Sequence, residues 1–193
     1  MAKRRPIIAV DVDLTITASD VEWKNWLLRH CEFTGIDAFM EDLDKDAVEY
    51  NLSEYFYCGD LNPFEFWKLP DLYDGMFCDE MSKVVLKHLY DKGWEIIFLS
   101  WCYGKGEHME SKHKMLRREY NFIADTDFHF MTTKSKNLAK CDYIVDDRNS
   151  FINQMDEEVQ CFKINTPYTQ DEELTRDCIV VDSWSEIINM LEV

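Results

Sequence analysis

The amino-acid sequence predicts an α/β protein with a doubly wound parallel sheet of the Rossmann type. Short apolar segments alternate with amphipathic helical segments from about residue 79 to the end of the chain. The apolar segments are continuous, as in strands that helices cover on both faces. Three of them end in polar residues, at Asp11, Ser100 and Asp146. Ligands bind beyond the carboxyl ends of such strands, so these residues mark the expected site.

The first strand is expected at 7–10, where the run IIAV stops at Asp11 and a second carboxylate follows at Asp13. A carboxylate at the mouth of a buried strand is costly unless a charged partner meets it. The alternative is a pair of solvated acids that cap the following helix. The order of the later motifs favours the functional interpretation.

The stretch after Asp13 has a helical pattern. Helices are expected over 23–33, 37–50 and 62–69. The first is predicted to begin with a capping box of Ser19 and Glu22 and to stop at Gly35. We therefore predict a small helical cap at 18–78, inserted after the first strand of a core made of 1–17 and 79–193.

The remaining core elements follow from the alternation of patterns. Helices are expected over 80–93, 109–120 and 183–191, with Gly93 as the stop of the first. Strands are expected over 94–100, 141–147, 159–164 and 178–181. This order of helices and strands is typical of a parallel sheet with helical crossovers.

Composition limits the function classes. The 193 residues suit one domain or a core with one insertion, and a net charge of -17 argues against extended nucleic-acid binding. Seven cysteines without a CxxC pair suggest neither a zinc knuckle nor a disulfide framework, and the odd count fits a reducing compartment. No apolar run suits a signal peptide or membrane span. We expect a cytoplasmic protein without a membrane partner, while oligomerisation stays open.

The polar residues at the strand ends suit phosphoryl transfer. They are Asp11, Asp13, Ser100, Lys136, Asp146 and Asp147. Acids from two strand ends can share Mg²⁺, which takes carboxylate, water and phosphate oxygens. A hydroxyl and an ammonium can hold the other phosphate oxygens, so that a carboxylate can attack phosphorus. The sequence therefore predicts a magnesium-dependent phosphate site.

These motifs resemble those of a known superfamily. The segments DVDLT (11–15), IIFLS (96–100), Lys136 and YIVDD (143–147) are similar, in order, to the four motifs of haloacid dehalogenase-like phosphohydrolases. KNLAKCDYIVDDR and SKHKMLRREY resemble the corresponding parts of 5'(3')-deoxyribonucleotidases and their phage and bacterial relatives. The resemblance covers nearly the whole core and is faint within the cap. It implies that the protein is a phosphatase and that it is located in the host cytoplasm if the chain is phage-encoded.

The resemblance also implies roles for the acids. Asp11 would be the nucleophile and a Mg²⁺ ligand. Asp13 would be the general acid and base, with its backbone carbonyl as a second ligand. Asp146 would complete the protein ligands of the metal. Asp147 would orient these ligands without binding the metal itself.

The phosphate of the substrate would be bound by Ser100, Lys136 and Thr15. By composition alone Lys134 and Lys140 compete with Lys136, whose spacing to the acidic pair matches the resemblance. The expected reaction is hydrolysis of a small phosphate monoester, a (deoxy)nucleoside monophosphate, through an aspartyl-phosphate. A 3'-phosphatase of nucleic-acid ends and a non-catalytic binding module are the alternatives. A receiver domain, whose acidic pair comes first in the chain, is disfavoured by the motif order.

Three further features have less specific interpretations. The segment LTIT (14–17) lacks the glycine usual in the turn after the second acid of nucleotidases. Most aromatic residues of 18–78 are expected to form the cap's own core, with one or two free to stack on a nucleobase. The basic stretch 105–118 is interpreted as a solvated helix face that could attract phosphate, and the histidines as structural or surface residues.

Overall fold

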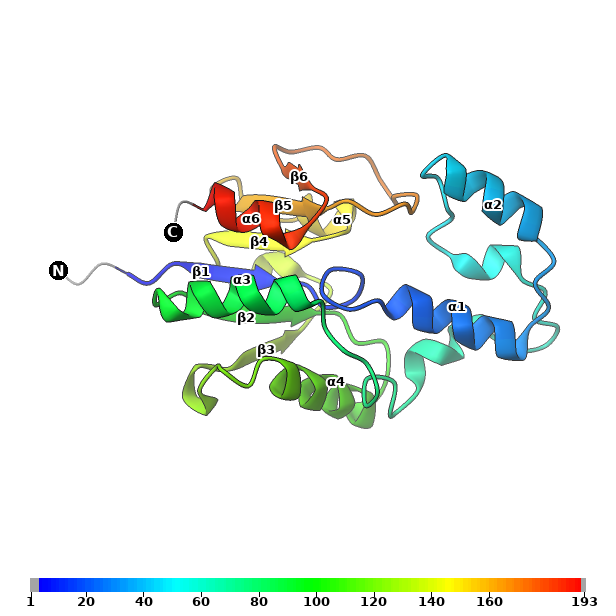
Figure 1. The fold of residues 1–193 in the computed structure, drawn as a ribbon, viewed down its shortest axis with the longest axis horizontal. Coiled ribbons are helices and arrows are strands. Elements are labelled where there is room, and N and C mark those ends of the chain that lie inside the picture. The colour runs from blue at the N-terminus through cyan, green and yellow to red at the C-terminus, as the bar shows by residue number, and fades with distance from the viewer. Residues whose placement is uncertain (1–3, 192–193) are drawn as a thin grey trace.

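The computed structural model describes residues 4–191 and contains a six-stranded, all-parallel sheet (Figure 1). The strands are β1 (Ile7–Val10), β2 (Glu95–Ser100), β3 (His129–Thr132), β4 (Tyr143–Asp146), β5 (Gln160–Ile164) and β6 (Ile179–Val181). Their order across the sheet is β3-β2-β1-β4-β5-β6. β1 is therefore central, with β2 and β4 as its neighbours. The predicted α/β class with a parallel sheet is confirmed.

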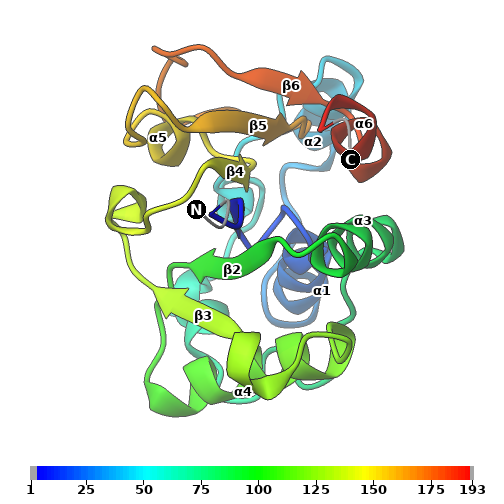
Figure 2. The same cartoon turned by 90° about the vertical axis from the view of Figure 1, so that its left-hand side faces the viewer.

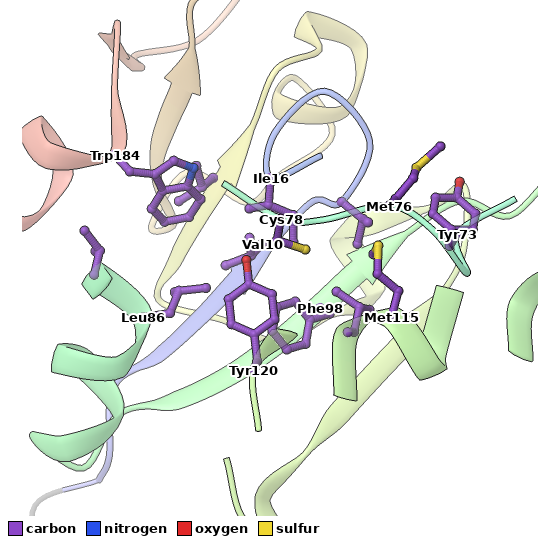
Figure 3. Close-up of a cluster of buried hydrophobic side chains, with 14 of the residues drawn as sticks. Val10, Ile16, Tyr73, Met76, Cys78, Leu86, Phe98, Met115, Tyr120 and Trp184 are labelled. Atoms are coloured by element: carbon purple, nitrogen blue, oxygen red, sulfur yellow. The ribbon is translucent and has the colours of Figure 1, made fainter. Parts of the chain in front are cut away.

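Helices pack on both faces of this sheet (Figures 1 and 2). α3 (Glu80–Asp91) and α6 (Trp184–Met190) lie side by side on one face, and α5 (Asn149–Ile152) lies on the other. α4 (Gly106–Glu119) contributes Met115 to the same apolar cluster as α3, which Figure 3 shows around Val10 and Phe98. A second cluster, containing Ala9 and Ile152, lies beneath α5. The arrangement is consistent with a doubly wound sheet.

The strand β3 is the one core strand that the sequence pattern does not reveal. It pairs with β2 at the edge of the sheet, and three of its four residues are exposed. An exposed edge strand has no need of a continuous apolar run, so its sequence HFMT resembles a loop. β3 leads to the short 3₁₀ helix Lys136–Leu138, which carries the predicted lysine.

Between β1 and α3 the chain forms a helical insertion beyond the carboxyl ends of the strands (Figure 1). It contains α1 (Ser19–His30), α2 (Ile36–Asp44) and the 3₁₀ helices Leu52–Tyr55 and Pro63–Lys68. The chain leaves and re-enters the core at adjacent points, because Thr17 bridges Cys78 and the Asp79 N–H donates to the Ile16 carbonyl at 2.8 Å. None of the helices described in residues 4–191 has the length and apolarity needed to cross a lipid bilayer.

Several predicted details of the insertion are wrong. The capping box is absent, because the Ala18 carbonyl opens α1 and places Ser19 inside the first turn, where its buried Oγ has no partner among the described residues. α1 ends at His30, and Gly35 instead precedes α2. α2 ends at Asp44, since the chain turns back at Asp46 with a positive φ of 52°.

The cysteine pattern suggests no disulfide framework, yet the described residues contain a disulfide. Cys31, just after α1, bonds to Cys58 across a sequence separation of 27. The pairing follows from a local antiparallel bridge between Glu32 and Tyr57, which brings the two cysteines together. Cysteine spacing alone cannot reveal a contact that depends on this bridge.

Candidate active site

The sheet brings the predicted acids together at the carboxyl ends of its central strands. Asp11 directly follows β1 and Asp146 ends β4, and these two strands are neighbours. The Asp11 N–H donates to the Val145 carbonyl at 2.9 Å, so the ladder continues into the site. Ser100 ends β2 on the other side of β1. The predicted convergence of strand ends is therefore present in the structure.

One part of the site is centred on Lys136. Its Nζ donates to Asp11 Oδ1 at 2.6 Å and to Asp146 Oδ2 at 2.5 Å, and all three side chains are buried. Lys134 and Lys140 are exposed. Of the three candidate lysines, Lys136 is therefore the one in the site. Its ammonium bridges the acids at the carboxyl ends of two adjacent strands.

Three buried carboxylates form a candidate metal site. Asp11, Asp146 and Asp147 each present an oxygen within 4.8 Å of the others. Asp147 Oδ2 is buried and has no hydrogen-bond partner among the described residues. Three carboxylates face the single ammonium of Lys136, so their charge is incompletely balanced. A hard divalent cation such as Mg²⁺ fits this donor set and its unpaired oxygen. The Asp13 carboxylate lies outside the group.

Burial shifts the ionisation of these groups. It raises the pKa of Asp11 to about 7, with the ammonium of Lys136 opposing the shift. Burial and the neighbouring Asp146 raise the pKa of Asp147 well above its ordinary value. Burial also disfavours the charge on Lys136, but the carboxylates of Asp11 and Asp146 outweigh it and raise the lysine's pKa. Without a further cation, the ionised forms of Asp11 and Asp147 are therefore disfavoured in this site.

A second part of the site is centred on Lys112 of α4, which sequence reasoning missed. Its Nζ donates to Asp13 Oδ2 at 2.6 Å and to Ser100 Oγ at 2.9 Å, and the side chain is fully buried. The basic stretch 105–118 is therefore not simply a solvated face. Helical spacing carried the signal, because Lys112 lies between His108 and Met115 on the apolar side of the helix.

The turn after Asp13 joins the two parts. Leu14 adopts a positive φ of 63°, the left-handed conformation that glycine normally supplies. The tight turn is therefore built without a glycine. Thr15 follows, and its hydroxyl donates to Asp147 Oδ1 at 3.2 Å. The structure thus directs this hydroxyl toward the acid group rather than into the neighbouring cavity.

A cavity of about 410 Å³ lies over these groups. Asp11, Asp13, Ser100 and Asp147 line its polar end. The rest of its wall is largely aromatic and comes from the insertion and the core: Trp23, Tyr50, Phe64, Trp67, Tyr73, Trp101, Tyr103 and Phe151. Its size suits a small organic ligand. Several insertion aromatics that the sequence suggested as a separate core therefore face the site.

Asn51, His108 and Arg148 also line the cavity. Nδ1 of the buried His108 lies 3.0 Å from the Leu69 carbonyl, and burial lowers the pKa of this histidine. Burial therefore favours its neutral form, in which Nδ1 donates to this carbonyl. Arg148 is paired with Asp171, and its guanidinium lies 4.9 Å from the Tyr50 ring centroid. His108 and Arg148 both have structural partners as well as cavity contact.

Searches of protein-family models and of curated proteins find no match for this chain.

Proposed function

We propose that the chain is a Mg²⁺-dependent phosphomonoesterase of the haloacid dehalogenase-like type that hydrolyses (deoxy)nucleoside monophosphates. The observation that carries the proposal is the position of Asp11 and Asp13 at the polar end of an aromatic cavity of about 410 Å³. Buried carboxylates beside lysines suit phosphate chemistry, and the flat aromatic walls suit a planar base. Both requirements of a nucleotide are present in one cavity.

The carboxylates of Asp11, Asp146 and Asp147 would hold the metal. When bound, a divalent cation would neutralise these acids and withdraw charge from the phosphoryl oxygens. Ser100 Oγ and Lys112 Nζ, which lie 2.9 Å apart, would donate to phosphate oxygens from the side of the site near Asp13. Lys136 would keep Asp11 in place for attack.

The reaction would run in two steps. In the first step, an Asp11 oxygen bonds to phosphorus while the bond between phosphorus and the leaving oxygen of the nucleoside breaks. The leaving oxygen takes the proton from the Asp13 carboxyl. In the second, water attacks phosphorus of the aspartyl-phosphate, Asp13 takes a proton from the water, and Asp11 is released as a carboxylate. The products are a nucleoside and inorganic phosphate.

The shape of the site supports a small substrate over a nucleic-acid end. Aromatic residues of the insertion, among them Trp23, Phe64 and Trp67, line the cavity together with the polar residues of the strand ends. The net charge of -17 adds repulsion toward a polyanion. A mononucleotide carries far less charge and needs only the cavity.

The test is phosphate release from deoxy- and ribonucleoside 5'- and 3'-monophosphates, sugar phosphates and one 3'-phosphorylated oligonucleotide. Each is measured with Mg²⁺ and with EDTA. We expect metal-dependent release concentrated on mononucleotides. Release confined to the oligonucleotide would replace the substrate assignment by the end-phosphatase alternative. No release from any phosphate ester would contradict the enzymatic function.

A further inference from the structure

A buried tyrosine reaches Asp13 from the segment that returns from the insertion to the core. Tyr73 is fully buried, and its hydroxyl donates to Asp13 Oδ1 at 2.9 Å. The other carboxylate oxygen, Oδ2, accepts from Lys112 at 2.6 Å and from Ser100 at 3.5 Å. Each oxygen of this carboxylate therefore has its own donors, and among the residues of 4–191 the Tyr73 hydroxyl is the donor to Oδ1.

Tyr73 is itself fixed by α4. Its backbone N–H donates to Ser111 Oγ at 3.0 Å, and its ring centroid lies 4.5 Å from Lys112 Nζ. The ring also meets the His108 ring edge-on, with centroids 5.2 Å apart. Figure 3 shows Tyr73 at one end of the apolar cluster, next to Met76. These contacts leave the hydroxyl little freedom to move away from Asp13.

We infer that Tyr73 is a positioning residue, whose hydroxyl holds the Asp13 carboxyl in the orientation needed for proton transfer to the leaving oxygen. The inference rests on the proposed function. A general acid must lie within about 2.6–3.2 Å of the oxygen it protonates, and a carboxyl free to rotate loses that alignment. Tyr73 belongs to the insertion side of the chain, so the alignment of the acid depends on this segment being docked on α4.

Leaving groups of different basicity distinguish positioning from general packing. A nucleoside alkoxide needs a proton as it leaves, whereas 4-nitrophenolate is stable as an anion. kcat/KM reports the steps up to loss of the leaving group, so it isolates the transfer that Asp13 performs. Tyr73→Phe should lower kcat/KM for a nucleoside monophosphate about tenfold, mainly through kcat, and that for 4-nitrophenyl phosphate less than about threefold.

Tyr120→Phe is the matched control. Tyr120 is equally buried and its hydroxyl lies 2.7 Å from Ser82 Oγ, away from the site. This variant should keep wild-type kcat/KM for both esters. Ser111→Ala, which removes the anchor of the Tyr73 N–H, should show a smaller loss with the same leaving-group dependence. It serves in place of Tyr73→Phe if thermal unfolding shows that Tyr73→Phe does not fold.

The outcomes separate this inference from the proposed function. Equal losses for the two esters, unchanged hydrolysis of the nucleotide, or the same loss in Tyr120→Phe would overturn the positioning role while the phosphatase assignment stands. A wild-type protein that hydrolyses neither ester would overturn the proposed function, and this inference with it.

Discussion

The Lys136 and Lys112 centres solve one physical problem in different surroundings. Each places a fully buried ammonium against an aspartate of the β1 loop. Lys136 bridges Asp11 and Asp146, and every group around it comes from the core. Lys112 reaches Asp13, whose side chain is 20% exposed and also accepts from Tyr73 of the insertion segment.

This difference in burial indicates that the two centres have different roles. The Lys136 centre is almost completely buried, and only Asp11 and the adjacent Asp147 reach the cavity, so its charges must be balanced within the protein and by a cation. The Lys112 centre borders the cavity and the insertion, where a proton acceptor and a substrate can meet. We expect substitutions at the first centre to affect both folding and chemistry, and those at the second to act more on chemistry.

The largest expected effect is at Asp11. Asp11→Asn removes the proposed nucleophile but keeps the shape of the side chain, so we expect loss of phosphate release by at least about 10³-fold. Circular dichroism should show an intact fold. Normal turnover in this variant would disprove the aspartyl-phosphate route.

The two lysines provide a direct contrast in stability. Lys136→Met leaves two buried carboxylates without their cation and should lower the free energy of unfolding by about 3–5 kcal/mol. Lys112→Met should cost about 1–3 kcal/mol, because water can reach Asp13. Urea denaturation in EDTA measures both values. Equal losses, or a larger loss for Lys112→Met, would remove the distinction between the centres.

Metal binding should act on the Lys136 centre in a pH-dependent way. The pKa of Asp11 is raised to about 7 and that of Asp147 is also raised, so the folded state favours the protonated acids. This contribution to stability is fully present below about pH 4 and is lost as the pH rises through the raised values. A Mg²⁺ concentration of 100 times the Kd at pH 8 should add about 2.7 kcal/mol at that pH, and the same concentration should add less at pH 5, where the protonated acids bind the ion more weakly.

The variant that tests this linkage is Asp147→Asn. It should weaken both the loss of metal-free stability toward pH 8 and the gain with Mg²⁺. Asp60→Asn changes an exposed acid of the insertion and should alter neither. Thermal unfolding with Mg²⁺ and with EDTA gives the comparison, and an unchanged Mg²⁺ effect in Asp147→Asn would exclude this carboxylate as a ligand.

A smaller effect is expected at the aromatic wall. Tyr103 lines the cavity and is 50% exposed, so Tyr103→Ala should raise KM for nucleoside monophosphates about five- to tenfold through lost stacking. Ribose 5-phosphate, which has no base, should be unaffected. Phe77 is 71% exposed and does not line this cavity, which makes Phe77→Ala the control. A similar change for both substrates would argue against stacking on the base.

The smallest effect concerns the turn between the centres. Leu14 holds a left-handed conformation that costs an ordinary residue about 1–2 kcal/mol. Leu14→Gly removes this strain but adds freedom to the unfolded chain, so we expect a net gain of about 0.5–1 kcal/mol. Urea denaturation measures it. A loss of stability would mean that the contacts of the Leu14 side chain outweigh its backbone strain.

Sequence reasoning recovered the site residues that lie at the ends of buried strands, and these belong to both centres. Asp11, Ser100 and Asp146 could be placed because each interrupts an apolar run at a strand end. Lys112 was missed although it lies on the apolar side of its helix, because a lysine on a helix is usually solvated. Tyr73 was likewise hidden among the aromatics of the insertion, whose assignments require tertiary contacts that spacing does not encode.

The insertion leaves and re-enters the core at Thr17 and Cys78, which bridge each other, and this has a consequence for how the sequence of such a protein can change. Because the chain departs and returns at one place, the intervening segment is a cassette that can be shortened or exchanged without rethreading a strand of the sheet. The acids and Lys136 would remain with the sheet, as would the part of the cavity wall that comes from the core, and only the wall residues of the insertion would change. A replacement would have to bring its own hydroxyl to Asp13, which ties the choice of ligand to the rate of the chemistry.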